Sequence, residues 1–297
     1  MHGFINVNKP QGITSFEVIK KIKQIIPGRF KIGHMGTLDP MASGVLPVAV
    51  GKATRVIPYI KNDIKCYLAE LTLGVVSDTQ DIWGEVRRTG INHFDINHLH
   101  SILGKMTGNI MQIPPMYSAL HYQGKRLYEL ARQGITVARK EREILIYSIQ
   151  LLKVDLDSEF PLIKIKIKCS PGTYVRTLCH DIGEKLGTGG LLSSLIRVRS
   201  GNFNIENSYP LEQLWQNKQN ISYYILPLDY PISTLPLVKI DSIEAIEAVM
   251  NGRMINIANA IPEGLIRLYA PTGHFIALAH SSYSEGKWMV KAERVFK

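Results

Sequence analysis

The segment from Gly33 to Pro40, GHMGTLDP, is the part of this chain best suited to carry chemistry. Gly33 and Gly36 permit backbone conformations and close approaches that other residues cannot adopt, while Pro40 biases Asp39 towards an extended geometry. A carboxylate held in such a loop points outwards. The apolar run that continues to Val50 indicates a core strand that tethers the loop. Loops on rigid scaffolds are where catalytic residues usually lie.

The same segment also has a purely structural interpretation. Asp followed by Pro is common in turns, where the carboxylate caps nearby backbone amides, and a glycine-rich loop alone is a weak signal. Taken alone, the stretch therefore favours a turn. The catalytic interpretation depends on motifs that follow later in the chain.

An amphipathic helix is expected shortly before this loop. Thr14 and Glu17 form a capping box, and apolar residues then recur at helical spacing. The opposite face carries Lys20 and Lys21, and the next acidic residue after Glu17 is Asp39. Such a run is usually just a solvated face, but this one leads directly to the Asp39 loop, where a phosphate backbone would need support. Lys20 and Lys21 are therefore candidates for phosphate contacts.

Two segments alternate apolar and polar residues, which is typical of half-buried strands. In residues 64–75, Tyr67 lies on the apolar face, where a tyrosine is most often a core residue with a satisfied hydroxyl. In residues 162–169, three lysines alternate with three isoleucines. Both segments are predicted to be strands.

A helix is predicted from Val175 to a stop at Gly187. Arg176 falls in its first turn, where a cation is unfavourable to the helix dipole. We therefore expect another interaction to hold this side chain.

Two further regions differ in amino-acid composition from these elements. Residues 113–143 combine prolines and tyrosines with basic residues such as Arg126 and Arg132, a mixture that suits stacking and phosphate contacts, although a mobile surface insertion would look the same. Beyond the prolines at 227, 231 and 236, a short helix over 243–250 and strand-like pieces predict a small β-rich module.

The formal charge of +10 over 297 residues favours polyanionic partners. Residues 1–230 hold 28 Lys and Arg against 19 Asp and Glu, whereas residues 231–297 hold 7 against 6, so the positive field belongs to the larger N-terminal part. Plain solubility is the alternative explanation.

Composition also excludes several classes of protein. No apolar run approaches the roughly 20 residues of a membrane helix, and the start lacks a secretory pattern, so cytoplasm is the expected location. The three cysteines form no CxxC pair, and the nine histidines show no metal-binding spacing. We expect chemistry without a metal.

Five strings occur in the order typical of one known family. They are GHMGTLDPMASGVLPVAVGKATR at 33–55, KCY at 65–67, IPPMYSALHYQGKRLYELARQG at 113–134, GTYVRTLCHDIGEKLG at 172–187 and LIRVRSGNF at 195–203. Together they resemble the tRNA pseudouridine synthase B family of bacteria. The resemblance implies an α+β catalytic domain over 1–232 with an antiparallel-rich sheet flanked by helices, a thumb-like insertion at about 114–143, and a β-rich, PUA-like RNA-binding domain over 233–297.

The resemblance also implies an activity and its residues. The activity is isomerisation of uridine 55 in the T loop of tRNA to pseudouridine, without cofactor and after extrusion of the base. Asp39 would be the nucleophile, Tyr67 would stack on uracil or take a proton, and Arg176 would pair with the acid and keep it ionised. The implied substrate contacts are His34, Leu195, Tyr174, Lys9 and Gly36, and the implied RNA-backbone contacts are Lys20, Lys21, Arg126 and Arg132.

One departure and two alternatives accompany the resemblance. Asn8 stands where the family often has Asp, which leaves Lys9 without that local acidic partner. An RNA-binding protein or tRNA chaperone would fit the charge and the β-rich end equally well, but it has no need of the Asp39, Tyr67 and Arg176 trio. An RNA-guided relative would share the site, but the thumb-like string favours a stand-alone, monomeric enzyme that acts on tRNA without an obligate protein partner.

Overall fold

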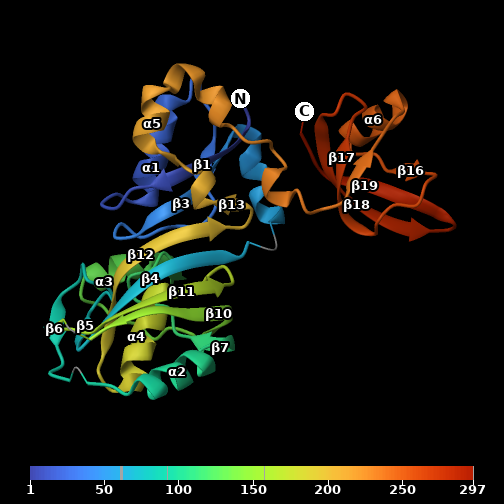
Figure 1. Cartoon of the computed structure of the whole chain (residues 1–297). Helices are drawn as coiled ribbons and strands as arrows, with labels where there is room; N and C mark the ends of the chain where they lie inside the picture. Colours follow the sequence, from blue (N-terminus) through green and yellow to red (C-terminus); the bar gives the residue numbers. More distant parts are fainter. Residues whose placement is uncertain (61–62, 92, 157, 297) are drawn as a thin grey trace.

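A computed structural model describes residues 1–60, 63–91, 93–156 and 158–296 of the chain. Within these ranges, ten strands form one mixed sheet and five strands near the C-terminus form another (Figure 1). The strands of the large sheet are β1 (Gly3–Lys9), β2 (Ile32–His34), β3 (Ser43–Val50), β4 (Lys65–Leu73), β7 (Gly108–Gln112), β10 (Arg142–Asp155), β11 (Leu162–Cys169), β12 (Gly190–Ser200), β13 (Phe203–Asn204) and β14 (Tyr209–Pro210). The strands of the small sheet are β15 (Leu237–Lys239), β16 (Ile255–Ile257), β17 (Gly264–Tyr269), β18 (Phe275–Ser284) and β19 (Lys287–Val295).

Two short hairpins and six α-helices complete the regular structure of these ranges. The hairpins pair β5 (Val75–Ser77) with β6 (Val86–Arg88) and β8 (His121–Tyr122) with β9 (Lys125–Arg126). The helices are α1 (Ser15–Ile25), α2 (Ile96–Lys105), α3 (Leu127–Arg132), α4 (Val175–Leu186), α5 (Leu211–Gln216) and α6 (Ile243–Met250). Short 3₁₀ turns are η1 (Gly51–Arg55), η2 (Ile57–Tyr59), η3 (Ile205–Asn207), η4 (Lys218–Tyr224) and η5 (Tyr230–Ile232).

The predicted elements are confirmed. Helix α1 starts with the expected capping box, in which Thr14 Oγ1 accepts from the Glu17 backbone N–H and Glu17 accepts from that of Thr14. Strands β4 and β11 fall on the two alternating segments and pair antiparallel. Helix α4 ends at Gly187, whose φ of +76° is the left-handed conformation that glycine adopts readily.

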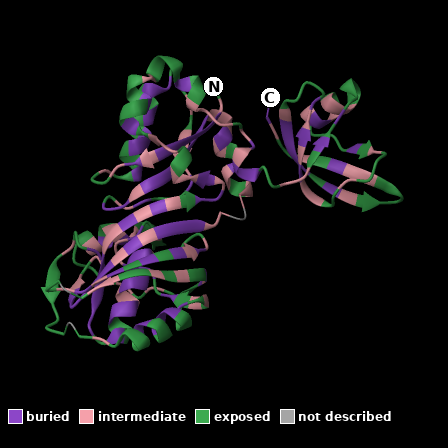
Figure 2. Cartoon of the chain, in the orientation of Figure 1, coloured by how far each residue is buried: buried purple, intermediate pink, exposed green. Residues whose placement is uncertain are grey.

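The large sheet has the order β14-β1-β3-β12-β4-β11-β10-β7, with β2 and β13 paired at its side. Most of its pairings are antiparallel, but β1 with β14 and β3 with β12 run parallel, and each of these two pairings has only two residue pairs. Figure 1 shows α1 and α5 beside the β1 end, with α2 and α4 covering the other half. In Figure 2 the central strands are mainly buried, whereas the outer faces of α1 and α2 are exposed. The mixed α+β class is confirmed.

The five-stranded sheet has its own apolar core, which includes Val249 of α6 and Ile266 of β17. A separate apolar cluster joins it to the large sheet, since Phe4 and Phe203 share that cluster with Leu278 of β18. The C-terminal part is therefore β-rich, as expected, and it packs against residues of β1, β3 and β13 of the large sheet.

No helix among the described residues combines the length and the apolar character needed to cross a lipid bilayer.

Candidate active site

Asp39 and Arg176, far apart in the sequence, meet as an ion pair. Arg176 Nε lies 2.9 Å from Asp39 Oδ2. The Arg176 side chain is only 6% exposed, whereas that of Asp39 is 35% exposed. The acid can therefore reach a ligand while the cation that orients it stays inside the protein. This contact is the interaction that the unfavourable position of Arg176 in the first turn of α4 led us to expect.

Arg176 is itself fixed from several sides. Its Nη1 group donates to the Thr79 carbonyl and its Nη2 group to the Tyr117 carbonyl, each over 2.9 Å. Nη1 also lies 3.5 Å from Asp81 Oδ2. Asp81 in turn accepts from the Thr79 hydroxyl and the Trp83 backbone N–H. Burial raises the pKa of Asp81, although the Thr79 hydrogen bond and Arg176 oppose that shift. One guanidinium thus ties the Asp39 loop to the loop after β5 and to the start of the 114–143 segment.

The Asp39 loop is held on both sides of the acid by the segment that leads into α1. Ser15 Oγ accepts from the Leu38 N–H at 2.8 Å and donates to the Leu38 carbonyl at 2.9 Å. The Gly12 N–H donates to the Pro40 carbonyl over 2.9 Å. Because these bonds fall one residue before and one residue after Asp39, the carboxylate is presented from a fixed backbone.

Three buried cations, Lys9, Lys65 and Arg197, donate to carbonyls of the same loop. Lys9 Nζ donates to the carbonyls of Pro10, Pro40 and Ala42, and Lys65 Nζ to that of Met35. Arg197 donates to the carbonyls of Gly36, Thr37 and Val45. Burial lowers the pKa of both Lys9 and Lys65 to about 8. The three side chains form a layer of cations beneath the loop, which we call the buried cation layer.

Lys9 does not lie where a contact to the substrate was predicted. Its side chain is fully buried and is hydrogen-bonded to backbone, so it supports the loop from below. The absence of an acidic residue at position 8 therefore leaves Lys9 well placed, because carbonyl oxygens supply its partners. Gly36, by contrast, is exposed at the start of the turn, with a φ of +105°.

Gly44 shows why the loop needs glycine next to this layer. Its φ is +101°, and a Cβ atom there would lie 2.3 Å from the backbone oxygen of Arg197. In the short parallel pairing of β3 with β12, Gly44 is the register partner of Arg197. A larger residue would push Arg197 away from the carbonyls that it holds.

Tyr67, Leu195 and His34 come from β4, β12 and β2, around the same junction of the sheet. Tyr67 is the register partner of Arg197, and both Tyr67 and Leu195 are buried in the main apolar core together with Leu38. Burial raises the pKa of Tyr67 to about 12, so its phenol is neutral near pH 7. Burial and Arg197 lower the pKa of His34, which favours a neutral imidazole.

Tyr174 precedes α4 and is fixed by a residue that the sequence did not single out. The Gln112 side chain accepts from the Tyr174 N–H at 2.9 Å and donates to its carbonyl at 3.0 Å. Gln112 therefore fixes the backbone of Tyr174, which is two residues before Arg176, and so positions the first turn of α4.

The four predicted RNA-backbone residues lie outside this centre. Lys20 and Lys21 are exposed on α1, and Lys21 lines a hollow between α1 and α5 together with Trp215. Arg132 is exposed, with its guanidinium over the Tyr128 ring. Arg126 is half-buried, and one of its guanidinium N–H groups donates to the Ala119 carbonyl within the 114–143 segment.

Four residues of the site were missed from the sequence: Lys65, Asp81, Gln112 and Arg197. Arg197 and Lys65 stand within strings that carry the family resemblance, so the strings held a signal for them. Their role depends on which carbonyls the distant loop presents to them, and local patterns do not contain that information.

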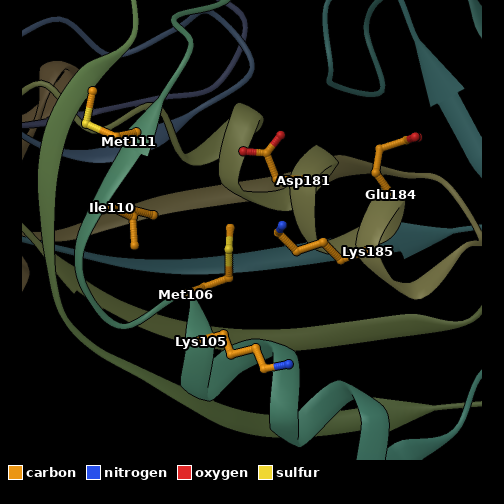
Figure 3. A pocket seen from close by; sticks show the side chains of 7 residues that line it. All are labelled: Lys105, Met106, Ile110, Met111, Asp181, Glu184 and Lys185. Atoms are coloured by element: carbon orange, nitrogen blue, oxygen red, sulfur yellow. The ribbon is translucent and has the colours of Figure 1, made fainter.

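A separate hollow of about 340 Å³ lies on another face of α4, towards α2 and β7 (Figure 3). Its charged lining consists of Lys105 and Lys185 together with Asp181 and Glu184. Because its two lysines are matched by two carboxylates, it lacks the uniform positive charge that favours a polyanion. We therefore place the candidate active site at Asp39.

Two sequence models match the chain. One, described as the TruB family pseudouridylate synthase N-terminal domain, covers residues 20–175, and the other, the tRNA pseudouridylate synthase B C-terminal domain, covers residues 176–233. A protein of Syntrophomonas wolfei named tRNA pseudouridine synthase B is 48% identical over 100% of this chain and 99% of its own length. One of the same name from Clostridium kluyveri is 42% identical over 94% of this chain and 95% of its own.

Solved structures show the same relationship. An H/ACA RNP bound to a substrate RNA containing 2′-deoxyuridine holds a chain that matches with a TM-score of 0.71 and 26% identity, over 99% of this chain and 85% of that one. A Cbf5-Nop10-Gar1 complex gives a TM-score of 0.71 and 28% identity over the same shares. From its matches along almost the whole sequence, this chain belongs to the TruB family of pseudouridylate synthases.

Proposed function

We infer that this protein isomerises uridine to pseudouridine in tRNA, and we propose position 55 in the T loop as its target. The observation that carries the inference is the 2.9 Å contact between Arg176 and a partly exposed Asp39. Membership of the TruB family and the tRNA enzymes among its relatives support it. A protein that only binds or refolds RNA would gain nothing from an acid oriented in this way.

The reaction breaks the N1–C1′ bond of the nucleotide and forms a C5–C1′ bond, while the C5 proton leaves and N1 regains one. Substrate and product have the same composition and oxidation level, so the reaction consumes no oxidant, reductant or group donor. We propose that Asp39 supplies the nucleophile, either to the sugar or to the base. A carboxylate performs comparable work at the anomeric carbon in glycosidases.

The remaining residues of the centre would hold the base. The uridine must leave its stack to reach Asp39, at an unstacking cost of a few kcal/mol. Because the Tyr67 phenol is neutral at neutral pH, it suits stacking on uracil better than removal of a proton. Leu195 and His34 would line the same space, and enclosure would keep the freed uracil in place while it turns.

Binding of the T arm is assigned to basic surfaces outside the centre. We propose that α1 and the 114–143 insertion contact phosphates, and that the five-stranded module at 233–297 is a PUA-like RNA-binding domain. We also propose that the protein acts as a monomer in the cytoplasm, without an obligate protein partner.

The test measures tritium release from a T-arm hairpin with uridine labelled at C5. The wild type should release one tritium per target uridine, and nucleoside analysis of the product should find pseudouridine at that position alone. Binding of the hairpin without release would favour the chaperone interpretation. Release from a different uridine would retain the isomerase and refute the assignment to position 55.

A further inference from the structure

Phe16 is a large aromatic side chain in an unusual place. It is 61% exposed in the first turn of α1, on the face opposite the buried residues Val18 and Ile22. The same face continues with Lys20 and Lys23 at helical spacing. An exposed ring on a basic stripe is well suited to a partner that is both negatively charged and aromatic.

The start of α1, which carries Phe16, is held beside the Asp39 loop. Its neighbour Ser15 is hydrogen-bonded twice to Leu38, the residue before Asp39. Together with the bond from Gly12 to Pro40, this contact registers the start of α1 against the Asp39 loop. A nucleotide chain that delivers a uridine to Asp39 would therefore run near this helix start.

Lys20 limits how the ring can be used. Its Nζ lies over the Phe16 ring, 5.0 Å from the centroid, as a cation–π pair. One face of the ring is thereby covered by an ammonium group, which leaves the other face for a flat ligand. An ammonium group beside the ring would also attract the phosphate of a nucleotide stacked there.

We propose that Phe16 and Lys20 form a stacking site for a base of the RNA substrate that flanks the extruded uridine, with Phe16 on the base and Lys20 on its phosphate. The proposal rests on the proposed function, because it names a contact of the same substrate. Stacking on an aromatic ring tolerates any base, so the site would add affinity and register rather than sequence preference.

The test measures the dissociation constant of a T-arm hairpin for the wild-type full chain and four variants. Phe16→Ala should raise the dissociation constant about 5- to 150-fold, the range found for loss of one base–aromatic stack. Phe16→Leu should bind as weakly as Phe16→Ala because it lacks the ring, whereas Phe16→Trp should bind as well as the wild type. Tyr223→Ala removes another exposed aromatic, one that is 84% exposed in η4, and should leave binding unchanged.

A second set of hairpins, each with one abasic nucleotide in the loop, identifies the base. At the stacking position, the abasic change should weaken binding to the wild type and leave binding to Phe16→Ala unaffected. Equal losses in both proteins at every position would overturn the proposal, as would wild-type affinity in Phe16→Ala or in Phe16→Leu. Thermal unfolding of each variant verifies that the fold is intact. These outcomes are independent of whether the wild type makes pseudouridine, which tests the proposed function itself.

Discussion

Two groups of cations, one beneath the Asp39 loop and one on the surface outside the candidate active site, differ in burial rather than in kind. The buried cation layer of Lys9, Lys65 and Arg197 donates to backbone carbonyls. Lys20 and Arg132 are exposed and lie over aromatic rings at the surface. The same residue types therefore serve two tasks: the buried group fixes the loop, and the exposed group is available to RNA.

The difference follows from desolvation. A buried cation is costly unless its donors are satisfied, and three carbonyls around one guanidinium meet that condition. An exposed cation keeps its hydration and is screened by salt, so it contributes to long-range attraction. We expect substitutions in the first group to change stability and rate, and those in the second to change RNA affinity and its salt dependence.

Asp39→Asn is expected to give the largest effect, because it removes the acid and leaves both groups of cations in place. Turnover should fall about 10⁴-fold or more, as for loss of other nucleophiles. The affinity for the T-arm hairpin should stay within a few-fold of the wild type. Single-turnover tritium release and hairpin binding measure the two quantities, and appreciable release by the variant would remove Asp39 from its role.

Arg176→Lys tests whether charge alone is enough beside Asp39. A lysine retains the cation but cannot span Asp39 and the carbonyls of Thr79 and Tyr117 at once. The rate at saturating RNA should fall about 100-fold, since hydrogen bonds to a charged group contribute about 1.5–3 kcal/mol each. A rate equal to that of the wild type would show that the fixed geometry is unnecessary.

Arg197→Met addresses the buried cation layer directly. It leaves the carbonyls of Gly36, Thr37 and Val45 without this donor, and the free energy of unfolding should fall by about 1–3 kcal/mol, the cost of leaving a buried polar group unsatisfied. Denaturant unfolding measures this change. Lys20→Met, the exposed counterpart, should change it by less than about 0.5 kcal/mol. Equal losses in the two variants would abolish the distinction between the groups.

Much of this architecture could be predicted from the sequence, because local patterns determine it. Strands β4 and β11 follow from alternation, and the dipole argument correctly demanded a partner for Arg176. The buried cation layer could not be predicted. In the 195–203 string, Arg197 and Arg199 are two residues apart and would share a face of a strand, yet only Arg197 meets the carbonyls of a loop from much earlier in the chain. Likewise Lys9 was expected to need an acidic neighbour, and backbone oxygens serve instead.

Lys20→Gln sharpens the description of the exposed group. Loss of one phosphate contact should weaken hairpin binding only a few-fold at physiological salt and reduce the slope of log affinity against log salt by about 0.7 to 0.9. Titrations at several salt concentrations measure the slope. Lys9→Met should leave the slope unchanged, because Lys9 is buried. An unchanged slope in Lys20→Gln would place this lysine outside the RNA contact.

The pH dependence of stability provides the most specific test of the buried group. Burial lowers the pKa of Lys9 to about 8, below the usual value of 10.5 in the unfolded chain. Between these two values the unfolded state binds more protons than the folded state, so the contribution of Lys9 to the free energy of unfolding rises with pH, by at most about 1.4 kcal/mol per pH unit.

Lys9→Met lacks this contribution, and all other titrating groups are shared with the wild type. The stability gap is the free energy of unfolding of the wild type minus that of Lys9→Met. It should therefore become more positive from pH 8 to pH 10, as measured by urea unfolding at fixed ionic strength. If Lys9 acted as an ordinary ion-pair partner, its pKa in the folded state would be raised instead. The stability gap would then become more negative as the lysine lost its charge. A stability gap that falls with pH would thus assign Lys9 to ion pairing, whereas a gap that rises with pH follows only if burial of its charge dominates.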